Sequence, residues 1–177
     1  MELVYNEIPR EFLEVLPDGI KYIARHGKDF LVVESLCCPQ GHSLMVDSVR
    51  IHGEPAVKIG VTIEGQKGSF FIDAFWGSHK KLCDFFPSAQ GGALVDAFCP
   101  VCGTSLMVGD ACSESGCGAA KHIQLLLPGE KNRILVCGRL GCPGHRLETQ
   151  KASGQIIKKI SDINFFGSQI DDFFGGI

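Results

Sequence analysis

Cysteines occur as three close pairs in the middle of the chain, and this spacing constrains the fold more than any other feature of the sequence. The tightest pair lies in Cys99-Pro100-Val101-Cys102-Gly103. The other two, Cys112 with Cys117 and Cys137 with Cys142, each have four intervening residues and a glycine before the second cysteine. Two thiolates separated by two residues can reach one tetrahedral ion from a tight turn. The spacing predicts metal sites that join separate stretches of the chain.

A redox role is the alternative for the tightest pair. A thioredoxin-type Cys-x-x-Cys is expected at the start of a helix that follows a buried strand. Here the residues that follow, Gly103-Thr104-Ser105-Leu106-Met107-Val108-Gly109, have the pattern of a strand. The sequence therefore favours metal binding over redox chemistry.

The N-terminus and the distribution of apolar residues bear on the compartment. Residues 1–7 have no basic start and no apolar segment of the kind found in signal peptides. No apolar run approaches the roughly 20 residues needed to cross a bilayer. We therefore expect a cytoplasmic protein, with no membrane partner, whose nine cysteines are reduced.

The cysteine-rich segment resembles a known family of small metal-binding units. A Cys-Pro-x-Cys-Gly turn, a strand and a Cys-x4-Cys pair are similar to the four-cysteine zinc ribbons at the ends of bacterial topoisomerases and in NAD-dependent DNA ligases. The resemblance covers only this segment. It implies a zinc-ribbon fold and bound zinc, and it implies neither ligase nor topoisomerase activity. The chain has one cysteine pair more than those ribbons, so a second site is expected.

The N-terminal half supplies partners for the extra pair. Cys37-Cys38-Pro39-Gln40-Gly41-His42 closely repeats the features of Gly141-Cys142-Pro143-Gly144-His145. Cys38 and His42 lie in a Pro/Gly turn, and with a Cys-x4-Cys pair they would complete a Cys3His site. The alternative is a buried thiol beside a surface histidine.

Local spacing suggests how the ligands are grouped. It favours Cys112 and Cys117 with the Cys99 turn, which leaves the third pair for Cys38 and His42; the opposite grouping remains open. His145 could replace one cysteine of the second site. The predicted metal ligands are Cys38, His42, Cys99, Cys102, Cys112, Cys117, Cys137, Cys142 and His145.

The remaining cysteines and histidines are expected to have structural or surface roles. Cys37, next to a predicted ligand, is predicted to be a small core residue or a hydrogen-bond neighbour, and Cys83 a core residue. The other histidines, at positions 26, 52, 79 and 122, are predicted to be surface or turn residues. Asp73, Trp76 and His79 could form a polar site, but a strand end with one buried aspartate is favoured.

Alternating apolar residues predict a mainly β fold. Val57, Ile59, Val61 and Ile63 alternate, as in a half-buried strand. We expect an antiparallel β meander or small sandwich with a short N-terminal helix in residues 1–90, a zinc-ribbon lobe in 91–150, and a C-terminal segment in 151–177. The Phe-rich tail of that last segment is expected to pack on its own domain, with partner binding as the alternative.

The predicted function is a binding role with structural metal. No Walker loop, nucleotide-binding glycine motif, GxSxG or HExxH is present. A net charge of -3 argues against a large non-specific nucleic-acid surface, which needs a basic face, and leaves only a small local basic patch open. We expect a protein-interaction or assembly module with two zinc ions, a protein partner and possible homo-oligomers. The alternatives are an open hydrolytic zinc site built from Cys38, His42 and Cys142 with a water, and an iron redox protein, which ranks below zinc.

Overall fold

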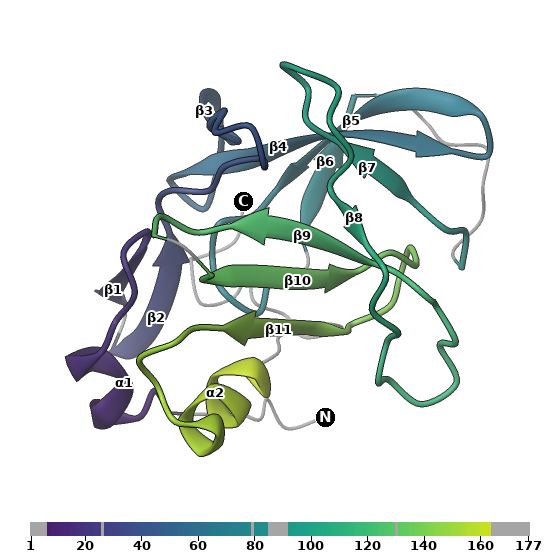
Figure 1. Ribbon diagram of the computed structural model, residues 1–177. Coiled ribbons are helices and arrows are strands. Elements are labelled where there is room, and N and C mark those ends of the chain that lie inside the picture. Colours follow the sequence, from purple (N-terminus) through teal and green to yellow (C-terminus); the bar gives the residue numbers. More distant parts are fainter. Residues whose placement is uncertain (1–6, 26, 79, 85–91, 130, 164–177) are drawn as a thin grey trace.

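The fold is mainly β, as the sequence predicts, with three antiparallel sheets and two short helices in the described part of the chain. The computed structural model describes residues 7–25, 27–78, 80–84, 92–129 and 131–163. The Phe-rich tail lies outside these residues. Figure 1 shows β9, β10 and β11 below β4, with both helices at the lower left of the molecule.

A short helix and a hairpin open the chain. Helix α1 (Arg10–Glu14) begins after Pro9, and β1 (Ile20–Arg25) pairs with β2 (Lys28–Val33) along its whole length. Backbone hydrogen bonds join β2 to the segment that follows β5 (Gln66–Ile72), and they connect the hairpin to the body of the protein. One of these bonds joins Val33 N–H to the Ala74 carbonyl at 2.8 Å.

The central sheet is built around one long strand, β4 (Glu54–Ile63). Its hydrogen-bonded order is β3 (Met45–Ile51), β4, β5 (Gln66–Ile72) and β6 (Lys81–Cys83), and β7 (Asp96–Phe98) also pairs with β4. Strand β5 occupies one edge of β4. The other edge of β4 pairs with two strands. The first residue of β3, Met45, lies opposite Val57, and the last residue of β7, Phe98, lies opposite Gly60. Strands β3 and β7 therefore meet end to end along β4.

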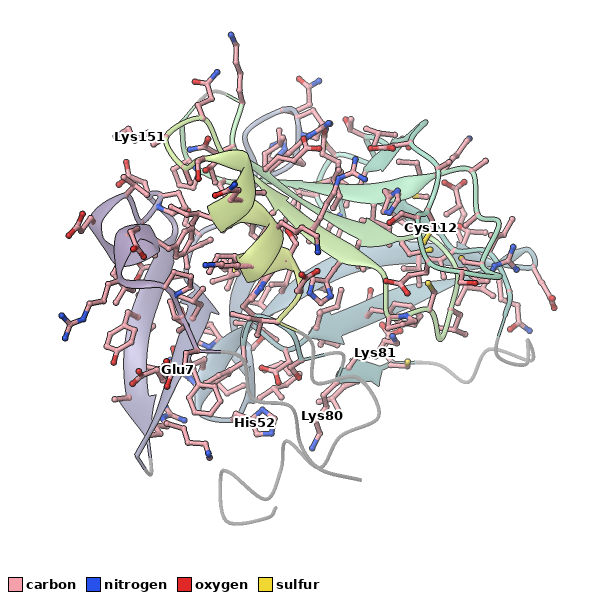
Figure 2. The ribbon with its side chains drawn as sticks, turned by 90° about the horizontal axis from the view of Figure 1, so that it is seen from below. Glu7, His52, Lys80, Lys81, Cys112 and Lys151 are labelled. Atoms are coloured by element: carbon pink, nitrogen blue, oxygen red, sulfur yellow. The ribbon has the colours of Figure 1, made fainter. Side chains whose placement is uncertain are left out.

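The second sheet is a meander of four strands, β8 (Met107–Val108), β9 (His122–Leu126), β10 (Arg133–Cys137) and β11 (His145–Glu148). In a meander the first and third connections leave the same end of the sheet, and Figure 1 shows the β8–β9 and β10–β11 connections together at one end. Helix α2 (Gly154–Ser161) packs against β11, where Ser161 Oγ accepts a hydrogen bond from Leu147 N–H. Figure 2 shows α2 lying across this sheet.

One hydrophobic core joins both sheets and α2. Ile59 of β4, Leu125 of β9 and Ile160 of α2 are all buried in the same cluster. Core residues thus come from each of the three predicted segments, and the boundaries of those segments remain a prediction. Neither helix in the described ranges has the length and apolar character needed to cross a bilayer.

We expect Gly60→Ala to destabilise the protein by about 1–3 kcal/mol, because the ring of Phe98 lies directly over Gly60. An added Cβ would be 2.2 Å from Phe98 Cε2 and 2.6 Å from Cζ, so the ring would have to move. Urea denaturation followed by circular dichroism measures the change. Gly109→Ala is the matched control, since its Cβ would meet nothing within 4 Å. Equal stability of the two variants would contradict this packing.

Candidate metal centres

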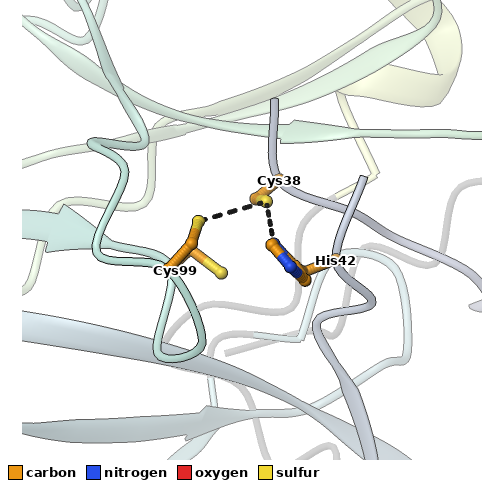
Figure 3. Close-up of side chains that lie close together, drawn as sticks. Cys38, His42 and Cys99 are labelled. Atoms are coloured by element: carbon orange, nitrogen blue, oxygen red, sulfur yellow. Dashed lines mark hydrogen bonds between the residues drawn. The ribbon is translucent and has the colours of Figure 1, made fainter. Parts of the chain in front are cut away.

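Four ligand atoms from two distant segments converge in site 1, which consists of Cys38, His42, Cys99 and Cys102. All four atoms lie within 4.8 Å of one another. Cys38 Sγ is 3.5 Å from His42 Nδ1 and 3.9 Å from Cys102 Sγ. Figure 3 shows Cys38, His42 and Cys99 facing one another between their two loops.

The central sheet explains why these segments meet. His42 lies three residues before β3, and Cys99 directly follows β7. Because β3 and β7 meet end to end along β4, the turn that precedes β3 and the turn that follows β7 are brought together. Gly41 and Gly103 adopt φ values of 88° and 75° in these turns, which glycine tolerates without strain.

Site 2 consists of Cys112, Cys117, Cys137 and Cys142, whose sulfurs also lie within 4.8 Å of one another. Two sulfur pairs are close: Cys112 and Cys142 are 3.7 Å apart, and Cys117 and Cys137 are 3.5 Å apart. The first two cysteines lie in the β8–β9 connection, and the last two lie at the end of β10 and in the turn to β11. Figure 2 places Cys112 at the end of the sheet remote from Lys151.

The spacing of the ligand atoms matches a tetrahedral metal. With metal–sulfur bonds of about 2.3 Å and metal–nitrogen bonds of about 2.0 Å, a tetrahedron separates two sulfurs by about 3.8 Å and a sulfur and a nitrogen by about 3.5 Å. The sulfur–sulfur distances of 3.5, 3.7 and 3.9 Å and the sulfur–nitrogen distance of 3.5 Å agree with these edges. A disulfide would need about 2.05 Å, so the thiols are unbonded.

Each of the seven cysteine sulfurs receives a backbone hydrogen bond from the residue two positions later. Distances of 3.3–3.4 Å are found for five of them. Cys102 and Cys117 receive the same bond from Thr104 and Ala119. Backbone N–H groups aimed at sulfur stabilise the thiolate form, which is the form that binds metal. The turns are therefore arranged around negatively charged sulfur.

The thiols of each cluster differ in pKa. Hydrogen bonds from the hydroxyl and backbone of Thr104 lower the pKa of Cys102 to about 6. The backbone N–H of Ala119 is the main cause that lowers the pKa of Cys117 to about 6. Burial raises the pKa of Cys99, Cys137 and Cys142. Neighbouring thiolates cannot all ionise without a cation, and a bound metal supplies that cation.

The grouping favoured by local spacing is wrong, and so is the opposite grouping, because neither Cys-x4-Cys pair lies with Cys99 and Cys102. Cys99 and Cys102 join Cys38 and His42, and not the Cys-x4-Cys pair that follows them. The reason is that Phe98 and Ser105 bridge across a hairpin whose tip carries Cys99 and Cys102, so β8 runs from this tip toward the opposite end. The hydrolytic triad of Cys38, His42 and Cys142 is not assembled either, because Cys142 belongs to site 2.

His145 belongs to neither cluster, although the sequence suggested it as a ligand. Its Nε2 is 2.8 Å from the carbonyl of Ile163, and its ring packs edge-on against Trp76 with the centroids 4.8 Å apart. Burial lowers the pKa of His145, and the histidine holds the end of α2 against Trp76, whose Nε1 donates to the Ile160 carbonyl.

Several residues outside the clusters differ from their predicted roles. Cys83 is exposed, so its expected place in the core is wrong, while Cys37 lies against the Leu126 carbonyl as a hydrogen-bond neighbour. His122 is buried and not on the surface, with Nδ1 2.6 Å from the Asp110 carbonyl. His26 and His79 lie outside the described residues.

A buried polar network is found where the sequence suggested a possible polar site. Asp73 follows β5, and its carboxylate accepts hydrogen bonds from His52 Nδ1 at 2.7 Å, Ser78 Oγ at 2.6 Å and Phe75 N–H at 3.1 Å. Burial raises the pKa of Asp73, while these bonds oppose the change. Trp76 points away to α2. No sequence pattern linked His52 to Asp73, because only the sheet brings them together.

The buried state of His122 predicts a pH dependence. Burial lowers its pKa, so as the pH falls below about 6.5 the unfolded chain takes up a proton that the folded chain resists, and stability falls. We expect His122→Gln to reduce the slope of unfolding free energy against pH by up to about 1.4 kcal/mol per unit in this range. Denaturation of both proteins from pH 7 to 5 tests this. Release of metal at low pH is expected to affect the unsubstituted protein and the variant alike. Identical slopes for the two proteins would show that His122 does not cause the pH dependence.

The two clusters differ from catalytic metal sites in their number of protein ligands. A catalytic zinc keeps one position for water, whereas a structural zinc is held by four protein ligands. Each cluster offers four side-chain ligand atoms, which is the closed arrangement. The arrangement can therefore bind two metal ions that join separate loops. Comparison with family models, curated proteins and solved structures gave no match to this chain.

Proposed function

We propose that the protein binds two zinc ions, one in each site, and that these closed sites support a protein-interaction or assembly module. A site of three cysteines and one histidine and a site of four cysteines both suit zinc in a reducing compartment. All nine cysteines are unpaired, which fits the proposed cytoplasmic location. Site 2 joins the ends of two hairpins, which supports a ribbon-like unit over residues 107–148.

One observation carries the metal proposal. Two separate groups of four ligand atoms, each drawn from two segments far apart in the sequence or from two different strand connections, are gathered within 4.8 Å of one another. Thiol contacts alone are weak. A metal ion supplies the attraction that keeps several ionisable sulfurs together. In this proposal the metal in site 1 fixes the junction of β3 with β7, and the metal in site 2 fixes one end of the meander.

Metal analysis of protein purified without added metal tests the proposal. We expect two zinc ions per chain by elemental analysis and native mass spectrometry, and no visible absorption. Iron in a four-cysteine site gives strong colour and would support the redox alternative. Fewer than one bound metal per chain, with the fold intact in strong chelator, would refute the metal proposal.

Exposed apolar side chains near the metal sites support the interaction role. Val101, at the tip of the site 1 turn, is 66% exposed, and Leu94 is 58% exposed. A metal-held turn presents such a side chain with little loss of freedom on binding, which favours protein contacts. The chain itself is the first partner to test.

Light scattering after size exclusion measures self-association through this turn. If Val101 lies in a contact between copies, Val101→Asp should make an oligomer dissociate while both metals remain bound. Leu82→Asp is the control, because Leu82 is 46% exposed on β6, outside the site 1 turn. If the unsubstituted protein and the Val101→Asp variant are both monomers, self-association through this turn is refuted, and the partner must be a different protein.

A further inference from the structure

An apolar cavity lies between the two sheets, and Cys137 and Cys142 of site 2 are among the residues that line it. Its volume is about 110 Å³, and it is partly open to solvent. The central sheet supplies Val57, Ile59 and Phe70, and the meander supplies Ile123 and Ile134. An apolar cavity with a few polar groups at its edge is the usual form of a small-molecule site.

Two cationic side chains line this cavity, and neither forms an ion pair with a carboxylate in the described residues. Lys81 makes no ion pair within the described ranges, and its Nζ lies 5.6 Å from the centroid of Phe70, another lining residue. Arg139 donates through Nη1 to the Gly92 carbonyl, but its buried Nε has no hydrogen-bond partner in the described structure. Buried polar groups normally find partners, so each unsatisfied group calls for an explanation.

The one carboxylate among the lining residues, that of Asp73, does not balance these cations. Asp73 accepts three hydrogen bonds, from His52, Ser78 and the backbone of Phe75, which occupy its carboxylate. An anion supplied from outside would pair with the lysine and the arginine and leave its apolar part in the cavity. Charge-assisted hydrogen bonds of this kind are stronger than neutral ones.

We propose that this cavity binds a small monocarboxylate with a short apolar body, with its carboxylate at Lys81 and Arg139. An apolar cavity of about 150 Å³ holds benzene, so a volume of about 110 Å³ fits a body of about four or five carbons. Arg139 belongs to the loop between Cys137 and Cys142, so site 2 holds one side of the cavity. The inference rests on the proposed function only in that the metal in site 2 would hold this loop in place.

Fluorescence of Trp76 provides a direct assay, because it is the only tryptophan and it lines the cavity. The metal-loaded protein is titrated with 3-methylbutanoate, and calorimetry repeats the measurement. We expect saturation below about 10 mM. The isosteric amide, 3-methylbutanamide, should bind at least about tenfold more weakly, because it lacks the charge.

Variants locate the ligand. Lys81→Met, which keeps the length and removes the charge, should weaken binding of the acid about tenfold without changing binding of the amide. Val136→Phe should fill the cavity and abolish both. Lys80→Met is the control, since the neighbouring lysine does not line the cavity. Lys81→Met should unfold like the unsubstituted protein, which separates lost binding from lost folding.

Two outcomes would overturn the inference. Absence of a saturable response to the acid would mean that Lys81 and Arg139 only balance the negative charge of site 2. Equal binding of acid and amide would mean that the cavity recognises apolar bulk and not a carboxylate. Metal content is measured on the same samples. Loss of binding with two metals present therefore refutes the cavity proposal alone, whereas absence of metal refutes the proposed function.

Discussion

Replacing Cys137 by serine is expected to remove one metal ion per chain and to unfold one end of the meander. Structural zinc contributes on the order of 10 kcal/mol to the folding of small zinc-binding peptides. This is comparable with the roughly 5–15 kcal/mol of total stability typical of a domain. Cys137 ends β10 and its sulfur contacts Cys117, so its loss opens both connections at this end. We expect the melting temperature to fall by at least about 10 °C.

Hydrogen exchange and metal analysis together test this expectation. Amides of residues 109–121 and 138–144 should lose protection, while those of β4 and β5 should keep it, since the hydrophobic core does not depend on site 2 alone. Cys83→Ser is the control, because Cys83 is exposed and belongs to neither cluster. If Cys137→Ser retains two metal ions and normal protection, site 2 is not a metal centre.

Asp73→Ala is expected to destabilise the protein by about 3–5 kcal/mol, the usual cost of removing one partner from a buried charged network. The side chains of His52 and Asp73 are 1% and 0% exposed, so no water replaces the lost acceptor. His52 and Gly53 form the two-residue turn between β3 and β4, with φ values of 53° and 83°. Asp73 holds the histidine in this left-handed conformation, which non-glycine residues rarely adopt.

Equilibrium unfolding in urea, followed by far-ultraviolet circular dichroism, measures the cost. Asp47→Ala is the control, because this aspartate lies on β3 with its side chain 84% exposed and should change stability by no more than about 0.5 kcal/mol. Asp73→Asn should fall between the two, since the amide oxygen can still accept some of the hydrogen bonds. A loss for Asp73→Ala as small as that of the control would show that the network contributes nothing.

Local patterns in the sequence carried enough information to predict several elements. The alternation of Val57, Ile59, Val61 and Ile63 corresponds to β4, and all four side chains are buried. Residues 64 and 65, of which the second is a glycine, form the turn into β5, with φ values of 49° and 81°. The apolar spacing of Ile156, Ile157 and Ile160 was compatible with strand or helix. The structure has a helix there, capped by Ser153, whose Oγ accepts from Ile156 N–H.

Shorter strands could not be predicted, because their pairing is not local. Strands β6, β7 and β8 have three, three and two residues, too few to show a period. Their positions depend on partners far along the chain, such as Gly60 for Phe98. The burial of His122 and the exposure of Cys83 have the same origin, since neither residue differs from its neighbours in any pattern that the sequence shows.

The sequence by itself determined which side chains gather as ligands. Cysteine spacing and Pro/Gly turns are local properties, and eight of the nine predicted ligands lie in the two clusters. Only the tertiary structure decided how they divide. Each cluster forms where two chain reversals reach the same place: at the junction of β3 and β7 along β4 for site 1, and at the common end of the β8–β9 and β10–β11 connections for site 2. The direction of the strands therefore decides which cysteine pairs lie together, and closeness in the sequence does not. The two ends of a strand lie far apart, so cysteines on either side of it belong to different sites.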